Sequence, residues 1–230
     1  MRSERVLRNI IDTTWRSDFA YVIGMIASDG YLYKDVTRIG IQSKDREMTE
    51  LFRKALLIEN KIGRKARGGE QEKRYYYVEF KSRQFYDFLK NLGITPAKSK
   101  TIQSVTVPDM YFSDFLRGLF DGDGTFWSHW DKRWPNSFVF HIAFYSASKP
   151  FMEWLLKRLS LLYGVKGFIK KGAGVFEIRY GKGDSRVLFE KMYYSKDILF
   201  LNRKYQKILE ALDLDRKIKQ NANHAVVAQW

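Results

Sequence analysis

The chain has 230 residues, of which 45% are hydrophobic and 16% aromatic, which is enough for a folded core and excludes a disordered protein. A formal net charge of +15 and a pI near 9.8 indicate a polyanionic partner, nucleic acid before a membrane surface. The sequence contains no cysteine, which excludes disulfides and cysteine-ligated metals, and we recognise no signal peptide and no apolar run of the ~20 residues that span a bilayer.

The first half of the chain is predicted to follow the order α-β-β-α-β-β-α. A helix begins with Asp18 as its N-cap and continues through "FAYVIGMIAS". The elements that follow are strands over 31–35 and 37–44, a helix over 45–60, a hairpin of 61–69 and 74–82 turning at Gly68–Gly69, and a helix over 83–94 capped by Gly93.

The second half repeats this order. Ser113 or Asp114 caps a helix through "FLRGLFDGDG", and the next elements are strands over 124–130 and 137–148, a helix over 149–164, a hairpin of 167–174 and 175–183, and a helix over 185–195. A last helix follows over 202–220, and the remaining residues have no clear periodicity. We therefore expect an α+β fold with an N-terminal half (1–100), a linker (101–112), a C-terminal half (113–220) and a tail (221–230).

The clearest sign of duplication is a pair of similar segments, 21–32 and 115–126, in which Gly24 aligns with Gly118 and Asp29 with Asp123. A mid-helix glycine costs about 1 kcal/mol relative to alanine and is often kept where another backbone approaches closely. If the two helices pack glycine to glycine, the two acids meet at a pseudo-twofold axis. Two close carboxylates need a cation between them, and Mg²⁺ prefers such oxygen ligands. This arrangement suits metal-assisted phosphodiester hydrolysis, whereas the alternative is an ordinary helix C-cap and turn in each half.

The segments 22–30 (VIGMIASDG) and 116–124 (LRGLFDGDG) resemble the paired signature of the single-chain LAGLIDADG homing endonucleases. The resemblance covers about residues 14 to 212 and implies two pseudo-symmetric halves packed through their first helices, each with a four-stranded antiparallel sheet for the DNA major groove. It also implies an intron-encoded, monomeric enzyme that makes a double-strand break in a long, non-palindromic DNA target. Mg²⁺ is the expected cofactor, with Mn²⁺ substituting and Ca²⁺ binding without turnover.

The resemblance also assigns candidate residues to the cleavage centre. Asp29 and Asp123 match the metal-binding acids, the carbonyls of Ser28 and Gly122 match backbone ligands, and Lys98 and Lys204 match basic residues near the scissile phosphates. Weaker candidates stand at the ends of the first hairpins: Gln42, Ser43, Lys44, Ser146 and Ser148. One departure is that Ala27 stands where the second segment has Asp121, a position that serves helix packing or capping more often than metal binding.

The two sheets together would cover roughly 20 base pairs, at about one helical turn per half. Arg, Lys, Gln and aromatic residues on the strands and turns are the candidate DNA contacts. They are Tyr31, Tyr33, Lys34, Arg38, Gln42, Lys44, Arg64, Arg67, Arg74, Tyr75 and Tyr77 in the first half, and Trp127, His129, Trp130, Arg133, His141, Lys166, Lys170, Lys171, Arg179 and Lys182 in the second. The three histidines show no metal-ligand spacing.

Two other functions stay open at this stage. A catalytically silent nucleic-acid binder of the same fold, an intron maturase or a regulator, would keep the sheets without the chemistry. Glu79-Phe80-Lys81 has the Glu-x-Lys form of a different metal-dependent nuclease class, but no convincing Asp precedes it on a neighbouring strand. In each case we expect a soluble intracellular protein, in the cytoplasm or in the organelle that holds the host intron.

Overall fold

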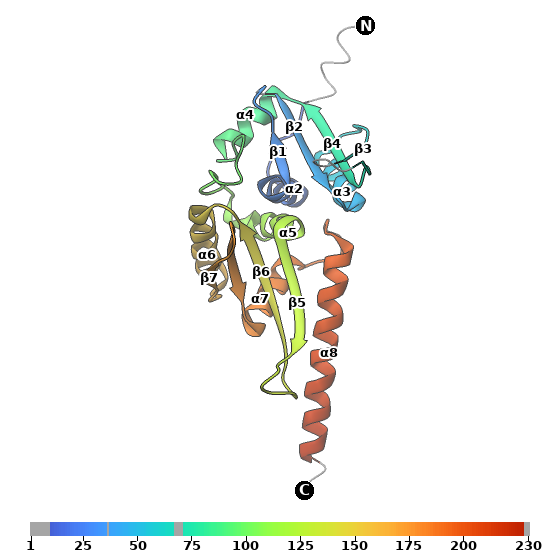
Figure 1. Cartoon of the computed structure of the whole chain (residues 1–230), viewed down its shortest axis with the longest axis vertical. Helices are drawn as coiled ribbons and strands as arrows, with labels where there is room; N and C mark the ends of the chain where they lie inside the picture. The colour runs from blue at the N-terminus through green and yellow to red at the C-terminus, as the bar shows by residue number, and fades with distance from the viewer. Residues whose placement is uncertain (1–9, 36, 67–70, 228–230) are drawn as a thin grey trace.

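The computed structural model describes residues 10–35, 37–66 and 71–227, and from residue 222 onward it describes the backbone alone. Two similar halves lie one above the other, with α2 and α5 side by side between them (Figure 1). The first half consists of α2 (Ser17–Ser28), β1 (Gly30–Leu32), β2 (Arg38–Ser43), α3 (Arg46–Leu56), β3 (Gly63–Lys65), β4 (Tyr75–Lys81) and α4 (Arg83–Asn91). The predicted turn at Gly68–Gly69 lies outside the described residues.

The second half repeats the order after a short 3₁₀ turn, η1 (Asp109–Tyr111). It consists of α5 (Phe112–Asp123), β5 (Gly124–Trp130), β6 (Phe138–Ser146), α6 (Lys149–Tyr163), β7 (Phe168–Lys171), β8 (Phe176–Tyr180) and α7 (Lys182–Met192), and α8 (Asn202–Val227) follows. The predicted α+β fold with two α-β-β-α-β-β-α halves is confirmed.

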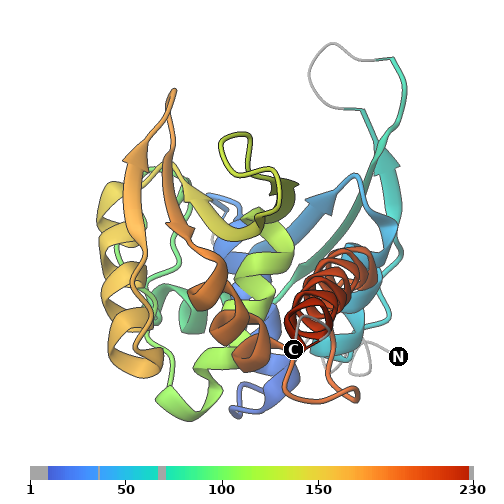
Figure 2. The same cartoon turned by 90° about the horizontal axis from the view of Figure 1, so that it is seen from below.

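Each half contains one four-stranded antiparallel sheet, with strand orders β1-β2-β4-β3 and β5-β6-β8-β7. Successive side chains of a strand point to opposite faces, so each sheet has a covered face and a second face that we call the open face. On β4, Val78 and Phe80 are buried on the covered face, whereas Tyr77 and Glu79 alternate with them on the open face. On β8, Ile178 and Tyr180 are buried, and Arg179 lies on the open face. Seen from below, the β7–β8 hairpin extends toward one side of the molecule, and α3, α7 and α8 lie on the other side (Figure 2).

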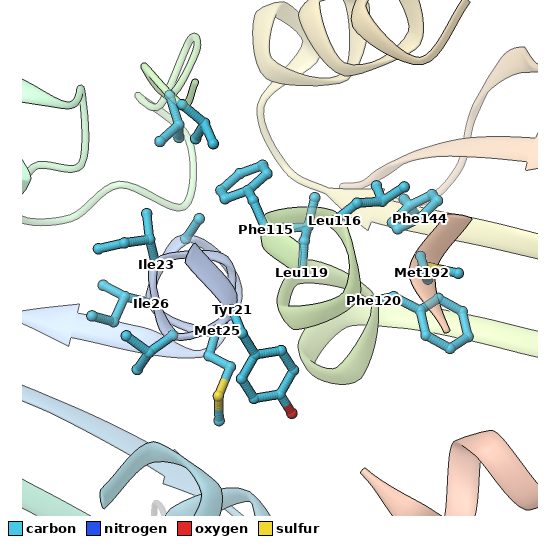
Figure 3. Packing of buried hydrophobic residues seen from close by; sticks show 14 of the residues in the cluster. Tyr21, Ile23, Met25, Ile26, Phe115, Leu116, Leu119, Phe120, Phe144 and Met192 are labelled. Carbon is cyan, nitrogen blue, oxygen red and sulfur yellow. The ribbon is translucent and has the colours of Figure 1, made fainter. Parts of the chain in front are cut away.

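The two central helices touch backbone to backbone. A Cβ atom built on Gly24 would lie 2.1 Å from the carbonyl oxygen of Phe115, and one built on Gly118 would lie 1.9 Å from that of Tyr21. Large apolar side chains leave this contact on both sides, so that Ile23 and Ile26 point into the first half and Phe120 lies among Phe144 and Met192 of the second half (Figure 3). The predicted close approach of the two glycine-bearing helices is confirmed.

Several predicted helix boundaries were wrong. The helix α3 ends at Leu56 rather than at residue 60, and α7 spans Lys182–Met192 rather than 185–195. The helix α2 begins at Ser17 with Arg16 as its N-cap and no side-chain cap, so Asp18 lies in the first turn. The helix α5 follows directly from η1, with Tyr111 as its N-cap residue, so neither Ser113 nor Asp114 caps it. The helix α8 continues to Val227, because the chain from 202 to 227 contains no glycine or proline to end it. The predicted cap at Gly93 is confirmed by its φ of +99° after α4.

Candidate metal centre and nucleic-acid interface

The C-terminal ends of α2 and α5 meet where the two Asp-Gly pairs lie. Ser28 ends α2, and Asp29 is its C-cap, while Asp123 is the last residue of α5. A Cβ atom built on Gly122 would lie 2.0 Å from Ser28 Oγ and 3.4 Å from Asp29 Oδ2. Only a residue without a side chain therefore allows the end of one helix to pack against the acid of the other. Asp29 is half-buried and Asp123 is exposed, so both have access to solvent.

Two lysines, one from each half, enclose these helix ends. Lys98 lies after α4, is only 6% exposed and donates from Nζ to the carbonyl oxygen of Ser28 at 2.6 Å. Lys204 lies in the first turn of α8 and donates to the carbonyls of Phe120 (2.6 Å), Gly122 (3.2 Å) and Gly124 (2.6 Å). The lysines thus contact the carbonyls of Ser28 and Gly122, the backbone groups that were assigned to metal binding.

The electrostatics of the centre are coupled across the two helices. Burial lowers the pKa of Lys98 to about 8, against the opposing attraction of Asp123 and Asp29. Burial likewise lowers the pKa of Lys204 to about 8, and the three acids Asp121, Asp29 and Asp123 oppose the shift. Although the Asp123 side chain is accessible, the surrounding protein removes enough water to raise its pKa, while Lys98 and Lys204 act to lower it. The charge of each lysine is therefore attracted by both signature carboxylates, so Asp29 and Asp123 belong to one electrostatic site.

Replacing Lys98 with methionine is expected to stabilise the protein by about 1–3 kcal/mol at pH 7, because the folded state then no longer holds a desolvated ammonium. The pKa of this lysine falls from 10.5 in the unfolded chain to about 8 in the fold. From pH 8 to 10.5 the unfolded state binds more protons, so wild-type stability rises with pH and the advantage of the variant shrinks. Urea unfolding between pH 7 and 10 measures this, with Lys100→Met at an exposed lysine as the matched control. A K98M variant that is destabilised at every pH would contradict the prediction.

The donors at the centre suit a divalent cation. Asp29 and Asp123 supply carboxylate oxygens from opposite helices, the nearby backbone supplies carbonyl oxygens, and Mg²⁺ prefers oxygen ligands of both kinds. Among the side chains that the structure describes, in residues 10–35, 37–66 and 71–221, no group of three or more His, Cys, Asp and Glu is placed to hold a metal ion. A cation here would therefore depend on the two signature acids.

Asp121, the acid without a counterpart in the first segment, serves helix packing. Its carboxylate is buried and accepts hydrogen bonds from Tyr21 Oη of the other half (2.7 Å), from the backbone N–H of Leu201 (2.8 Å) and from Tyr193 Oη (3.4 Å). Burial raises its pKa to about 6 in spite of these donors. The packing role expected for this position is confirmed, and the acid ties α5 to α2 and to the segment before α8.

Asp121→Asn is expected to destabilise the protein by about 1–3 kcal/mol, because one amide oxygen replaces two acceptor oxygens and the amide nitrogen then faces a donor. The free energy of unfolding at pH 7, measured in urea, tests this. Asp197→Asn at an exposed loop position provides the control and is expected to change stability by less than about 0.5 kcal/mol. Equal stabilities of the two variants would rule out the buried network.

The open face of the first sheet is aromatic and cationic. Strand pairing places Tyr31, Arg38, Gln42, Tyr75 and Tyr77 on this face. The guanidinium of Arg38 lies 4.4 Å from the ring centre of Tyr33, which follows β1. Lys34, Lys44 and Arg74 lie in the adjoining turns and are exposed.

The open face of the second sheet differs in its side chains. The register places Trp127, His129, His141, Lys170 and Arg179 there. The ring centres of Trp127 and His141 are 5.1 Å apart, and Arg179 lies 5.0 Å over Trp127. Arg133 and Lys166 are exposed in the adjoining loops.

Some predicted DNA contacts do not lie on the open faces. The strand register pairs Arg64 with Tyr76, Trp130 with Phe138 and Lys171 with Phe176. These partners lie on the covered faces, so the three predicted contacts lie on the covered faces as well. Lys182 forms an ion pair with Asp215 of α8 and donates to the carbonyl of Phe138, so it anchors α8 rather than facing DNA. Arg67 lies outside the described residues. Lys65, Glu79 and Glu177 are further charged residues on the open faces, although none of them was among the candidate DNA contacts.

Part of the chain matches a known protein family. Residues 17–93 match the family described as LAGLIDADG-like domain. This match lies in the first half of the chain. No curated protein matches the chain.

Solved structures share the fold over most of this chain, across both halves. The homing endonuclease I-WcaI, bound to its DNA recognition sequence, is 13% identical over 89% of this chain and 91% of its own, with a TM-score of 0.64. I-DmoI in complex with DNA and Mn is 17% identical over 78% of this chain and 97% of its own, with a TM-score of 0.51. Full-length DUF199/WhiA from Thermatoga maritima is 14% identical over 96% of this chain and 70% of its own, with a TM-score of 0.55. The predicted resemblance to single-chain LAGLIDADG proteins is confirmed.

Proposed function

We propose that this protein is a site-specific DNA endonuclease that makes a double-strand break in a long, non-palindromic target and promotes the homing of the intron that encodes it. The observation that supports this most directly is the meeting of the two helix ends, where Gly122 of α5 packs against Ser28 and Asp29 at the end of α2. Lys98 and Lys204 are both attracted there by the carboxylates of Asp29 and Asp123. A pair of carboxylates at a pseudo-twofold axis suits two cuts, one on each strand.

The residues of the centre have separate roles in this proposal. Asp29 and Asp123 would hold a divalent cation, Mg²⁺ with Mn²⁺ as a substitute, and the carbonyls of Ser28 and Gly122 lie beside them. When bound, such a cation supplies Lewis-acid polarisation of phosphate oxygens. Lys98 and Lys204 place ammonium groups at the helix ends, where they offset phosphate charge as the DNA approaches. I-DmoI has been described with DNA and Mn and with DNA and Ca, which supports the choice of a divalent cation.

The open faces support double-stranded DNA as the substrate. Arginines, lysines and aromatic rings gather on both sheets, and such side chains contact phosphates and base edges. The two sheets would cover roughly 20 base pairs as a monomer. Within the described parts of the chain, no helix is both long enough and apolar enough to cross a membrane.

A second candidate is a nucleic-acid binder that does not cleave, an intron maturase or a regulator. The observation that favours it is that Lys98 and Lys204 donate to the carbonyls of Ser28 and Gly122, which leaves these oxygens less available to a cation. DUF199/WhiA also shares the fold.

Incubating the purified chain with a plasmid library in the presence of Mg²⁺ separates the two candidates. Linearised plasmids that share a sequence at the break, and that disappear when EDTA replaces Mg²⁺, are the expected result. Selective DNA retention without breaks in Mg²⁺ or Mn²⁺ would favour the silent binder.

A further inference from the structure

An acidic side chain stands in the middle of the basic open face of the first sheet. Glu79 lies on β4, opposite Gly40 of β2. Tyr31 Oη donates to Glu79 Oε1 at 2.7 Å, and Tyr33 Oη donates to the same oxygen at 2.9 Å. No hydrogen bond from any other described residue reaches Oε2. One oxygen is thus held from two sides, and the other remains able to accept.

The backbone is shaped for this arrangement. A Cβ atom on Gly40 would lie 2.8 Å from both Cζ and Oη of Tyr31, so the glycine lets the ring lie across β2 and reach Glu79. Tyr31 and Tyr33 meet edge to face with their ring centres 5.4 Å apart, and Lys65 Nζ lies 5.1 Å from the ring centre of Tyr31. Burial raises the pKa of both tyrosines, as does hydrogen bonding to Glu79, so both hydroxyls stay protonated and donate.

We propose that Glu79 is a specificity-determining residue that selects cytosine through its Oε2 acceptor, with Tyr31 and Tyr33 as positioning residues. The inference rests on the proposed DNA-binding function. In the major groove cytosine presents only the N4 amino donor, whereas guanine presents the acceptors N7 and O6 and thymine presents O4. Adenine places an acceptor next to its donor, so a carboxylate suits cytosine best. Because the protons of the two tyrosine hydroxyls are already donated to Glu79, the tyrosines cannot donate to an acceptor on a base.

The second sheet carries the opposite charge at the equivalent place. Gly30 pairs with Ile41, and Ile41 with Val78; in the other half Gly124 pairs with Phe144, and Phe144 with Ile178. The next residues along β4 and β8 are therefore Glu79 and Arg179. Arg179 is held by Glu177, with Nε to Oε1 at 2.7 Å and Nη2 to Oε2 at 3.1 Å. The guanidinium of Arg179 is a donor and therefore suits a base with acceptors in the major groove, such as guanine. Glu79 and Arg179 would thus prefer different bases at equivalent positions of the two half-sites, and the target is not symmetric there.

Selection from a randomised duplex library tests the assignment. Four proteins are used to retain DNA in the presence of Ca²⁺, and the bound DNA is sequenced: the wild type, Glu79→Gln, Tyr31→Phe and the control Glu59→Gln. Glu59 is an exposed glutamate after α3. Glutamine keeps an oxygen for both tyrosines and is the usual partner of adenine. We expect wild type and E59Q to share one motif with a preferred cytosine, and E79Q to change that position alone to adenine, by about tenfold. Y31F is expected to weaken the cytosine preference without replacing it.

The outcomes separate this inference from the proposed function. A motif that is the same for wild type and E79Q overturns the role of Glu79 and leaves site-specific DNA binding intact. The absence of any enriched motif with folded wild-type protein overturns both. If E79Q changes the selected motif at several base pairs, the glutamate maintains the structure of the sheet rather than reading one base, and the inference is also overturned.

Discussion

Replacing Asp29 or Asp123 with asparagine is expected to lower the rate of double-strand cleavage by about a thousandfold or more while leaving DNA binding as strong as in the wild type. The amide removes the charge that a divalent cation requires, and metal-dependent stabilisation of the transition state is worth several kcal/mol. Binding should not weaken, because each change removes a negative charge from the region that faces phosphates. Plasmid linearisation under single-turnover conditions measures cleavage, and retention of labelled duplex in Ca²⁺ measures binding.

The two single variants also distinguish shared from separate use of the acids. If both strands depend on cations held jointly by Asp29 and Asp123, either variant loses nicking as well as linearisation. If each acid serves one strand, a single variant converts supercoiled plasmid to the nicked circle and stops there. Asp197→Asn, in an exposed loop, is the matched control and should cleave at the wild-type rate. Cleavage by D29N at the wild-type rate would falsify the proposed centre.

The parts of the site that could be predicted from sequence are those that carry a local signal twice. Gly24 and Gly118 stand out because glycine is costly inside a helix, and the structure gives the reason as backbone contact at both positions. Asp29 and Asp123 were found in the same two segments, and Lys98 lies at the end of one of these helices, with its Nζ donating to the Ser28 carbonyl. Alternation along β4 and β8 likewise distinguishes core positions from open-face positions, since strand periodicity is itself local.

What could not be predicted depends on partners far away in the sequence. Arg64 was chosen over Lys65, because the register of β3 against β4 decides which of two neighbouring cations faces outward. Arg117 lies inside a signature segment, and yet it is fully buried and donates to the carbonyls of Leu199 and Met192. Lys182 was assigned to DNA because no local pattern shows Asp215, buried on α8, as its partner.

Alanine at Gly24 or at Gly118 is expected to destabilise the protein by about 3 kcal/mol or more, in the upper range for overpacking, although alanine is the better helix former by about 1 kcal/mol. The Cβ atoms would lie 2.1 Å from the carbonyl oxygen of Phe115 and 1.9 Å from that of Tyr21. These neighbours are backbone atoms, so no change of rotamer relieves the contact and the helices must separate. The free energy of unfolding in urea measures the effect.

Gly183→Ala tests whether the effect comes from the helix interface rather than from the loss of a glycine. Gly183 lies in the first turn of α7, and a Cβ atom there would meet nothing within 4 Å. Helix propensity then acts alone, so G183A should leave stability unchanged or raise it by up to about 1 kcal/mol. Separation of the helices would also move Asp29 away from Asp123, so a folded G118A should lose cleavage by more than its stability implies. A G118A variant as stable and active as G183A would show that the halves do not depend on contact between these two backbones.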